Sequence, residues 1–187
     1  MNLKHRAPRY SFCFALCLGL CTAACSGGSD GGQPNGGDDQ IFLAFAADFR
    51  GYHSYPSFDV SGEAELIGIH DGSVITEYIN QLPPSGSTEF PRGTIIVKEA
   101  TGGTMGHELF AMVKRGGGFN SGAPGWEWFE LLNLDDGSDG VKIVWRGFGP
   151  PIGEEYGGDA EGGCNKCHGA CSGNDSVCTS KIQLADL

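Results

Sequence analysis

Residues 94–115, TIIVKEATGGTMGHELFAMVKR, decide the fold class of this chain. Two runs rich in β-branched and aromatic residues, 94–99 and 108–115, lie on either side of the glycine-rich break ATGGTMG. Such a pattern is typical of two antiparallel strands joined as a hairpin. In the first run Ile96 and Lys98 would share one face of the sheet, because side chains alternate between the faces along a strand.

The same pattern continues on both sides of this hairpin. It predicts further strands at 74–79, 126–132 and 141–145, separated by Gly- or Pro-rich breaks with lengths typical of hairpins and meanders. The apolar segment 41–49 predicts one helix packed on the core. Because parallel βαβ units have no room, the sequence predicts an α+β fold, a mainly antiparallel sheet with a few helices. Glycine makes up 32 of 187 residues, which favours turns over a helical bundle.

The composition argues against two functional classes. Lys and Arg total 12 against 23 Asp and Glu, so the formal net charge is −11. Binding to nucleic acid needs clustered Lys and Arg, and this balance opposes it. No apolar run reaches the ~20 residues of a membrane-spanning helix, which argues against an integral membrane protein.

The first four of the eight cysteines lie within residues 13–25. Residues 1–24 contain basic residues, then the apolar run SFCFALCLGL, then small residues before Cys25, as in a lipoprotein-type signal peptide. The segment TAACS resembles the bacterial lipobox, in which Cys25 would be acylated and become the mature N-terminus. The alternative is an ordinary secretory signal that is cut after Ala24.

The lipoprotein interpretation also predicts the domain organisation and the location. Residues 25–40 would be the acylated cysteine and a flexible Gly/Ser/Asp tether, and residues 41–187 would be the folded domain. The domain would be exported and held on the cell envelope facing the periplasm by its lipid anchor alone. By resemblance to other lipoproteins, Ser26 after the acylated cysteine favours the outer membrane.

The other four cysteines lie in the last 24 residues and include the motif CNKCH at 164–168. C-x-x-C-H is the signature of covalent haem attachment: Cys164 and Cys167 would add to the two vinyl groups, and His168 would be the proximal iron ligand. The rival interpretations are half a zinc site, a redox C-x-x-C pair and a structural disulfide. A zinc site would need two further ligands, but the sequence has no second C-x-x-C or H-x-x-H pair.

An ordinary cytochrome c fold does not agree with this position of the motif. Small electron-transfer cytochromes c are helical, carry the motif near their start and supply a downstream Met as the sixth ligand. Here 19 residues follow His168, and none of them is Met.

Several segments, in their order along the chain, resemble the cytochrome P-460 family, which includes the cytochrome c-prime beta proteins. They are FPRGTIIVKE at 90–99, FAMVKR at 110–115, GWEWF at 125–129, CNKCH at 164–168 and DSVCT at 175–179. The resemblance covers roughly residues 68–179. It implies a mainly antiparallel sheet with helices, often a homodimer, and one five-coordinate haem c with an open distal side.

The resemblance also implies a role for Lys98. In the hydroxylamine-oxidising members, the lysine of the VKE strand bonds through its side-chain nitrogen to a meso carbon of the haem, and this lysine aligns with Lys98. Such a lysine must be desolvated to react as a neutral amine. Its neighbours Ile96 and Val97 are apolar, which agrees with burial.

The distal position departs from the hydroxylamine-oxidising pattern. Those relatives place a proton-relaying carboxylate on the strand after the VKE strand, where this chain has Phe110. The c-prime beta relatives cap their haem with Phe and bind nitric oxide or other small gases. Glu108 lies two residues away on the same expected face and is a candidate distal acid, and Glu99 and Glu127 are further candidates.

Two further groups of residues carry expectations. Cys171 and Cys178, seven residues apart in an exported chain, are expected to form a disulfide, the alternative being two free buried thiols. As second axial ligands we considered His53, His70 and His107, although a lone histidine is more often a surface or loop residue.

The sequence therefore indicates an exported mono-haem c protein with an open iron site for small nitrogen species. If it is an enzyme, it would oxidise hydroxylamine and pass electrons to an external acceptor. The alternative is a non-enzymatic haem protein that binds nitric oxide or transfers electrons, like cytochrome c-prime beta. A third alternative is a disulfide-stapled cell-surface module without haem.

Overall fold

The computed structural model describes residues 40–63, 70, 72–153 and 163–187. All of them belong to one compact unit, Asn35–Leu187. The predicted signal peptide, Cys25 and nearly all of the predicted tether lie outside the described residues. Within the described part of the chain, no helix is long and apolar enough to cross a membrane.

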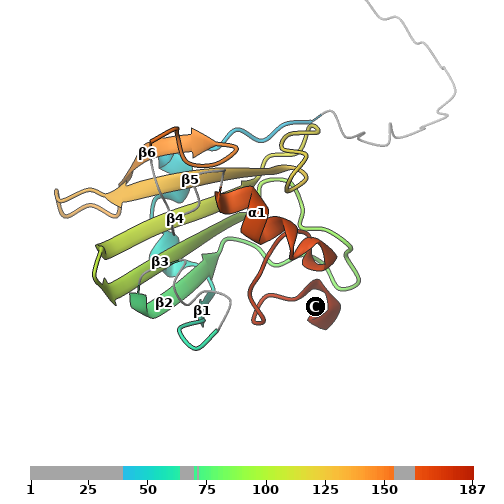
Figure 1. Ribbon diagram of the computed structural model, residues 1–187, viewed down its shortest axis with the longest axis horizontal. Coiled ribbons are helices and arrows are strands. Elements are labelled where there is room, and N and C mark those ends of the chain that lie inside the picture. The colour runs from blue at the N-terminus through green and yellow to red at the C-terminus, as the bar shows by residue number, and fades with distance from the viewer. Residues whose placement is uncertain (1–39, 64–69, 71, 154–162) are drawn as a thin grey trace, which may run out of the picture. The chain divides into compact units, whose positions relative to one another are not determined.

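One six-stranded antiparallel sheet forms the body of this unit (Figure 1). Each strand pairs with the next along the chain, so the sheet is a simple meander. The strands are β1 (Ser57–Asp59), β2 (Gly72–Ile79), β3 (Ile95–Gly103), β4 (Gly106–Lys114), β5 (Trp126–Asn133) and β6 (Val141–Gly147). The prediction of a mainly antiparallel sheet with few helices is confirmed.

The five predicted strands are all present, with ends that differ by a few residues. The largest difference is at the β3–β4 hairpin, where pairing continues into the predicted break and joins Gly103 to Gly106. Gly102 and Gly106 have positive φ angles of 75° and 88°, which suit glycine and allow this tight reversal. Strand β1 was not predicted, because three residues are too short to show an alternating pattern.

The prediction of one helix over 41–49 is wrong. Only Ala46–Phe49 is helical, as the short 3-10 helix η1. Before it the chain is extended: Ile41 forms an isolated bridge with Gly116, and Phe42 N–H donates to the carbonyl of Arg115. Exposed and buried residues alternate from Ile41 to Phe45, which is a period of two rather than a helical period.

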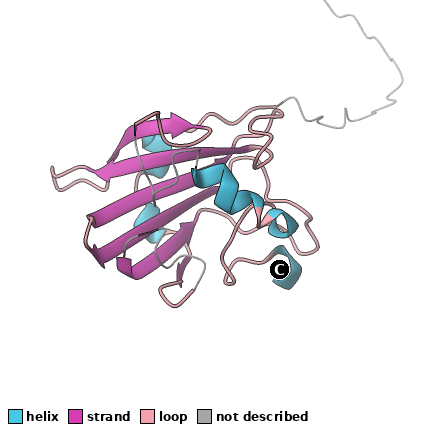
Figure 2. Cartoon of the chain, in the orientation of Figure 1, coloured by secondary structure: helices cyan, strands magenta, loops and turns pink. Residues whose placement is uncertain are grey.

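The remaining helices are short (Figure 2). The 3-10 helix η2 (Tyr52–Ser54) follows η1, and the single α-helix, α1 (Gly163–Gly169), contains the CNKCH motif. Two more 3-10 helices, η3 (Ser172–Asn174) and η4 (Leu184–Asp186), lie in the C-terminal segment.

The two faces of the sheet are covered by different parts of the chain. On one face, side chains such as Val97, Val113 and Phe129 pack against the N-terminal residues Phe49 and Tyr52. The other face packs against the C-terminal segment. Its core contains Ile96, Met112, Trp126, Trp128 and Trp145 from the strands, together with Val177, Ile182 and Leu184, and Cys164 of α1 packs against it.

Asp175 joins the C-terminal segment to this second face. Its carboxylate lies 2.6 Å from Lys114 Nζ and accepts a hydrogen bond from the backbone N–H of Phe90 at 2.8 Å. The backbone carbonyl of Asp175 accepts a bond from Trp126 Nε1 at 2.6 Å. Both charged side chains are almost fully buried, with exposed fractions of 6% for Lys114 and 9% for Asp175.

We expect Asp175→Asn to lower the free energy of unfolding by about 3 kcal/mol, because it leaves the buried Lys114 ammonium with only the exposed carboxylate of Glu89, 3.9 Å away. Asn tolerates the left-handed backbone that residue 175 adopts (φ 49°), so the change removes the charge without straining the backbone. Denaturant unfolding followed by circular dichroism measures the effect. The matched control Asp135→Asn, at an exposed loop position, should change stability by less than about 0.5 kcal/mol; equal effects would show that the ion pair is not stabilising.

Candidate functional site

Helix α1 brings the residues of the CNKCH motif together. Cys164 and Cys167 are three positions apart, so their side chains lie on the same side of one helical turn. Both are free thiols, whereas Cys171 and Cys178 form a disulfide. The structure therefore keeps the two motif cysteines available and uses the following pair as a covalent link.

Asn165, between the two motif cysteines, fixes α1 against the sheet. Its Oδ1 accepts hydrogen bonds from Trp128 Nε1 at 2.7 Å and from Asn120 Nδ2 at 2.8 Å. The contact is close, since a Cβ atom at Gly122 would lie 3.0 Å from the Asn165 side chain. The orientation of α1 is thus set by Trp128 of β5 and by Asn120 in the loop before β5.

His168 is oriented as a neutral metal ligand would be. Its Nδ1 lies 2.8 Å from the backbone carbonyl oxygen of Ser176, which can only accept, so Nδ1 carries the proton. Burial, and after it the nearby charge of Lys98, lower the pKa of His168 to about 4. At neutral pH the imidazole is therefore uncharged, with its lone pair on Nε2.

The disulfide-closed loop presents the carbonyl that orients His168. Ser176 lies between Cys171 and Cys178, and its backbone N–H donates to the Cys171 carbonyl at 3.0 Å. Ser176 has a positive φ of 66°, as does Asp175 before it. The loop therefore turns sharply and directs the Ser176 carbonyl back toward α1.

On the sheet, the predicted residues Lys98 and Phe110 are direct cross-strand neighbours. The register pairs Glu77 with Lys98, Lys98 with Phe110, and Phe110 with Glu130 on the face that α1 covers. Lys98 is 7% exposed and Glu77 is 2% exposed. The Lys98 Nζ and Glu77 Oε1 atoms lie 3.2 Å apart, so a buried ion pair occupies this row.

Glu108 lies on the same face as Phe110, next along β4, and is partly buried. The other two candidate acids do not belong to the site. Glu99 and Glu127 alternate to the opposite face, where Glu127 binds Arg146 at 2.7 Å and 2.8 Å. Their expectation as distal acids is wrong, because the strand register carries their side chains away from α1.

The three histidines that are candidates for the second axial ligand also lie on different faces of the sheet. His53 and His107 are about half exposed and contact Glu99, at 3.6 Å and 2.8 Å. His70 instead packs on Phe110, with ring centroids 5.2 Å apart. Burial, and after it the nearby positive charge of Lys98, lower the pKa of His70 well below its ordinary value.

Buried polar atoms without a hydrogen-bond partner gather around this site. Within the described residues they are His70 Nδ1, Glu77 Oε2 and Ser176 Oγ. Each belongs to a residue that contacts Lys98, Phe110 or His168. A buried polar atom without a partner costs ~1–3 kcal/mol, so three such atoms in one place indicate that another group completes the site.

The chemistry of the donor atoms discriminates between the interpretations of the motif. Cys164 and Cys167 are free thiols that are not bonded to each other. Burial raises the pKa of the Cys164 thiol to about 12, the opposite of an activated redox thiolate. No group of three or more His, Cys, Asp and Glu among the described residues is arranged to hold a metal ion by itself, as zinc would need. Two thiols and one neutral imidazole do fit the requirements of haem c attachment.

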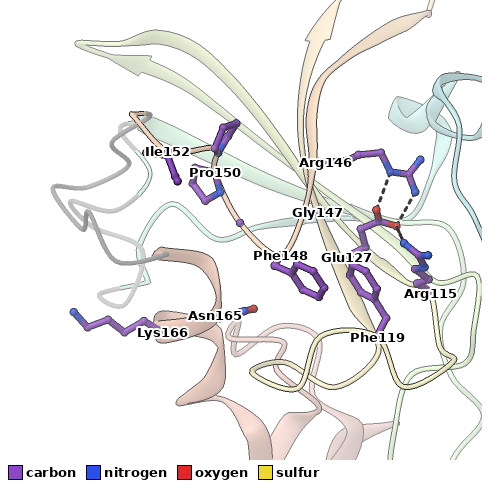
Figure 3. Close-up of a pocket in the computed structure, with 12 residues that line it drawn as sticks. Arg115, Phe119, Glu127, Arg146, Gly147, Phe148, Pro150, Ile152, Asn165 and Lys166 are labelled. Carbon is purple, nitrogen blue, oxygen red and sulfur yellow. Dashed lines mark hydrogen bonds and ion pairs between the residues drawn. The ribbon is translucent and has the colours of Figure 1, made fainter.

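A pocket of about 730 Å³ lies between α1 and the segment that follows β6 (Figure 3). Its wall includes Phe148, which stacks on Phe119 with a centroid distance of 4.5 Å, and the Glu127–Arg146 ion pair. Only Asn165 and Lys166 of the motif border it, and none of the three donor residues does. This pocket is therefore distinct from the site formed by Cys164, Cys167 and His168.

Several residues of the site are not identifiable from the sequence. Glu77 becomes visible as the partner of Lys98 only when the β2–β3 register is known. Asn165 and Ser176 act through hydrogen bonds that no motif encodes. His70 precedes β2 and gives no signal beyond being a histidine.

Comparisons with protein-family models, with curated proteins and with solved structures find no match for this chain.

Proposed function

We propose that this protein carries one haem c, attached through thioether bonds to Cys164 and Cys167, with His168 as the proximal ligand. The observation that carries the proposal is the state of His168. The Ser176 carbonyl holds its Nδ1–H, and burial keeps the ring neutral, so Nε2 is free to bind iron. A proximal ligand needs this combination of tautomer and charge, and it occurs directly beside two free thiols.

The open side of the haem would bind a small nitrogen species such as nitric oxide or hydroxylamine. Haem iron supplies the coordination position and the change of redox state. The chain supplies an apolar cap in Phe110 and a buried ion pair in Lys98 and Glu77, all on the sheet face under α1. The resemblance to the cytochrome P-460 and c-prime beta proteins supports the same ligand class.

Two candidate activities use this pocket differently. Non-enzymatic gas binding or electron transfer is favoured by Phe110, which excludes polar groups and cannot take up a proton. Hydroxylamine oxidation releases protons and electrons, and it is favoured by the buried carboxylate of Glu77, with Glu108 and Glu130 on the same face. In the second case electrons would leave to an external acceptor.

The proposal places this domain outside the cytoplasm, where haem c is attached. A lipid on Cys25 would hold it to the cell envelope, facing the periplasm from the outer membrane, with the lipid as its only membrane contact. Homodimer formation is part of the same proposal, on the basis of the resemblance.

Serine variants of the two cysteine pairs test the covalent attachment of the haem. We expect haem to remain on the wild-type protein through denaturing electrophoresis and acid–acetone extraction, because thioether bonds survive both. Cys164→Ser combined with Cys167→Ser should release it. The matched control, Cys171→Ser with Cys178→Ser, should keep the haem bound, since that pair forms the disulfide. Freely extractable haem in the wild type, or zinc in its place, would show that the assignment is wrong.

A bond between Lys98 and a meso carbon of the haem should shift the ferrous absorption spectrum to longer wavelength than that of an ordinary haem c. Lys98→Arg should restore an ordinary spectrum, because Arg can keep the charge beside Glu77 but does not provide a neutral amine. Mass analysis of the haem peptide gives the direct answer. Recovery of Lys98 in an unmodified wild-type peptide would exclude the cross-link.

One set of measurements tests the ligand class and distinguishes between the two candidate activities. We expect the ferrous protein to bind nitric oxide with a change in its absorption spectrum. Hydroxylamine-dependent reduction of an artificial electron acceptor would establish the enzymatic candidate, and its absence with intact nitric oxide binding would establish the gas-binding one. A haem protein that binds neither molecule would contradict the open iron site.

A further inference from the structure

His70 is a buried histidine that takes no part in the proposed attachment of the haem. It lies just before β2, and its ring packs on the ring of Phe110 at a centroid distance of 5.2 Å. Its Nδ1 is buried and has no hydrogen-bond partner among the described residues. Such a nitrogen is costly unless something else bonds to it.

The strand register shows where His70 stands relative to His168. The ring of His168 packs on Trp128, at a centroid distance of 4.5 Å, and Trp128 pairs with Met112. His70 packs on Phe110, two residues before Met112 on the same face of β4. The two imidazoles therefore stand over neighbouring rows of one sheet face, and these rows are about 7 Å apart along the strands.

The charge state of His70 suits a hydrogen-bonding role. Burial and the positive charge of Lys98 lower its pKa, so the ring is neutral at physiological pH. A neutral imidazole has one donor nitrogen and one acceptor nitrogen. It can therefore donate to an oxygen or nitrogen atom of a small ligand, or accept a proton from it, whereas the adjacent Phe110 can do neither.

We propose that His70 is the distal residue of this site, whose Nδ1 forms a hydrogen bond with the small ligand on the side of the iron opposite His168. The inference rests on the proposed haem attachment and deepens it, because it identifies the polar group that meets the ligand. Phe110 then supports the His70 ring and excludes water, and Lys98 lies beside both.

Carbon monoxide is a suitable probe, because the C–O stretching frequency of its ferrous complex falls when a nearby group donates a hydrogen bond. The comparison uses the full-length holoprotein in four forms: wild type, His70→Leu, His70→Asn and His53→Leu. Asn places an amide near the position of Nδ1 and should keep the interaction, whereas Leu removes it. His53, half exposed on the opposite face, is the matched control.

We expect His70→Leu to raise the C–O stretching frequency and to increase the carbon monoxide dissociation rate about three- to ten-fold, the factor for one lost hydrogen bond. His70→Asn and His53→Leu should stay close to the wild type. Haem content and circular dichroism establish that each variant is folded and loaded.

An unchanged frequency and rate in folded His70→Leu would overturn the assignment, because His70 would then not reach the ligand. A low-spin ferric wild type that becomes high-spin in His70→Leu would also overturn it, since His70 would be an iron ligand itself. Failure of the proposed function has a different signature: the wild type would lack covalent haem, or no form would bind carbon monoxide, and the role of His70 would fall with it.

Discussion

The buried ion pair between Lys114 and Asp175 is the interaction on which the candidate site depends. It ties the segment after α1 to β4, and Trp126 adds a hydrogen bond to the same residue through its indole nitrogen. Ser176 follows Asp175 directly and supplies the carbonyl that orients His168. Asp175 and Ser176 are thus adjacent in the chain, so the position of His168 is set by the sheet rather than by the short helix that carries it.

A second buried ion pair, between Lys98 and Glu77, lies on the same sheet face, and its role differs from that of Lys114 and Asp175. Lys98 and Glu77 are paired across β2 and β3, both nearly inaccessible to solvent, and one oxygen of Glu77 has no partner. Well-packed apolar residues at these two positions would stabilise the sheet as well or better, because burying charge is costly. The pair is therefore better explained by chemistry at the site than by stability, and the unpartnered nitrogen of His70 close by supports the same view.

The sequence predicts those parts of the protein that follow from local pattern. Alternation along 94–99 places Lys98 on the face of Ile96, and the register of β3 and β4 then brings Phe110 beside it. The apolar composition of the segment 41–49 predicts a helix, but it does not reveal the alternation of exposed and buried side chains that the structure has. Glu77 and His70 could not have been predicted, since each is identified by contacts between segments whose pairing only the folded chain defines.

The state of Lys98 decides which activity the pocket can support. While Lys98 is an ammonium, Glu77 is its counter-charge and cannot take up a proton without leaving a buried positive charge unpaired. A Lys98 nitrogen bonded to a ring carbon would no longer need that counter-charge, and Glu77 would then be free to accept protons from a substrate. Without that bond, the polar groups left on this face are the neutral imidazole of His70 beside Phe110 and the carboxylates of Glu108 and Glu130. A cross-link at Lys98 would therefore change what Glu77 can do, which couples the proposed covalent bond to one of the proton acceptors that hydroxylamine oxidation would need.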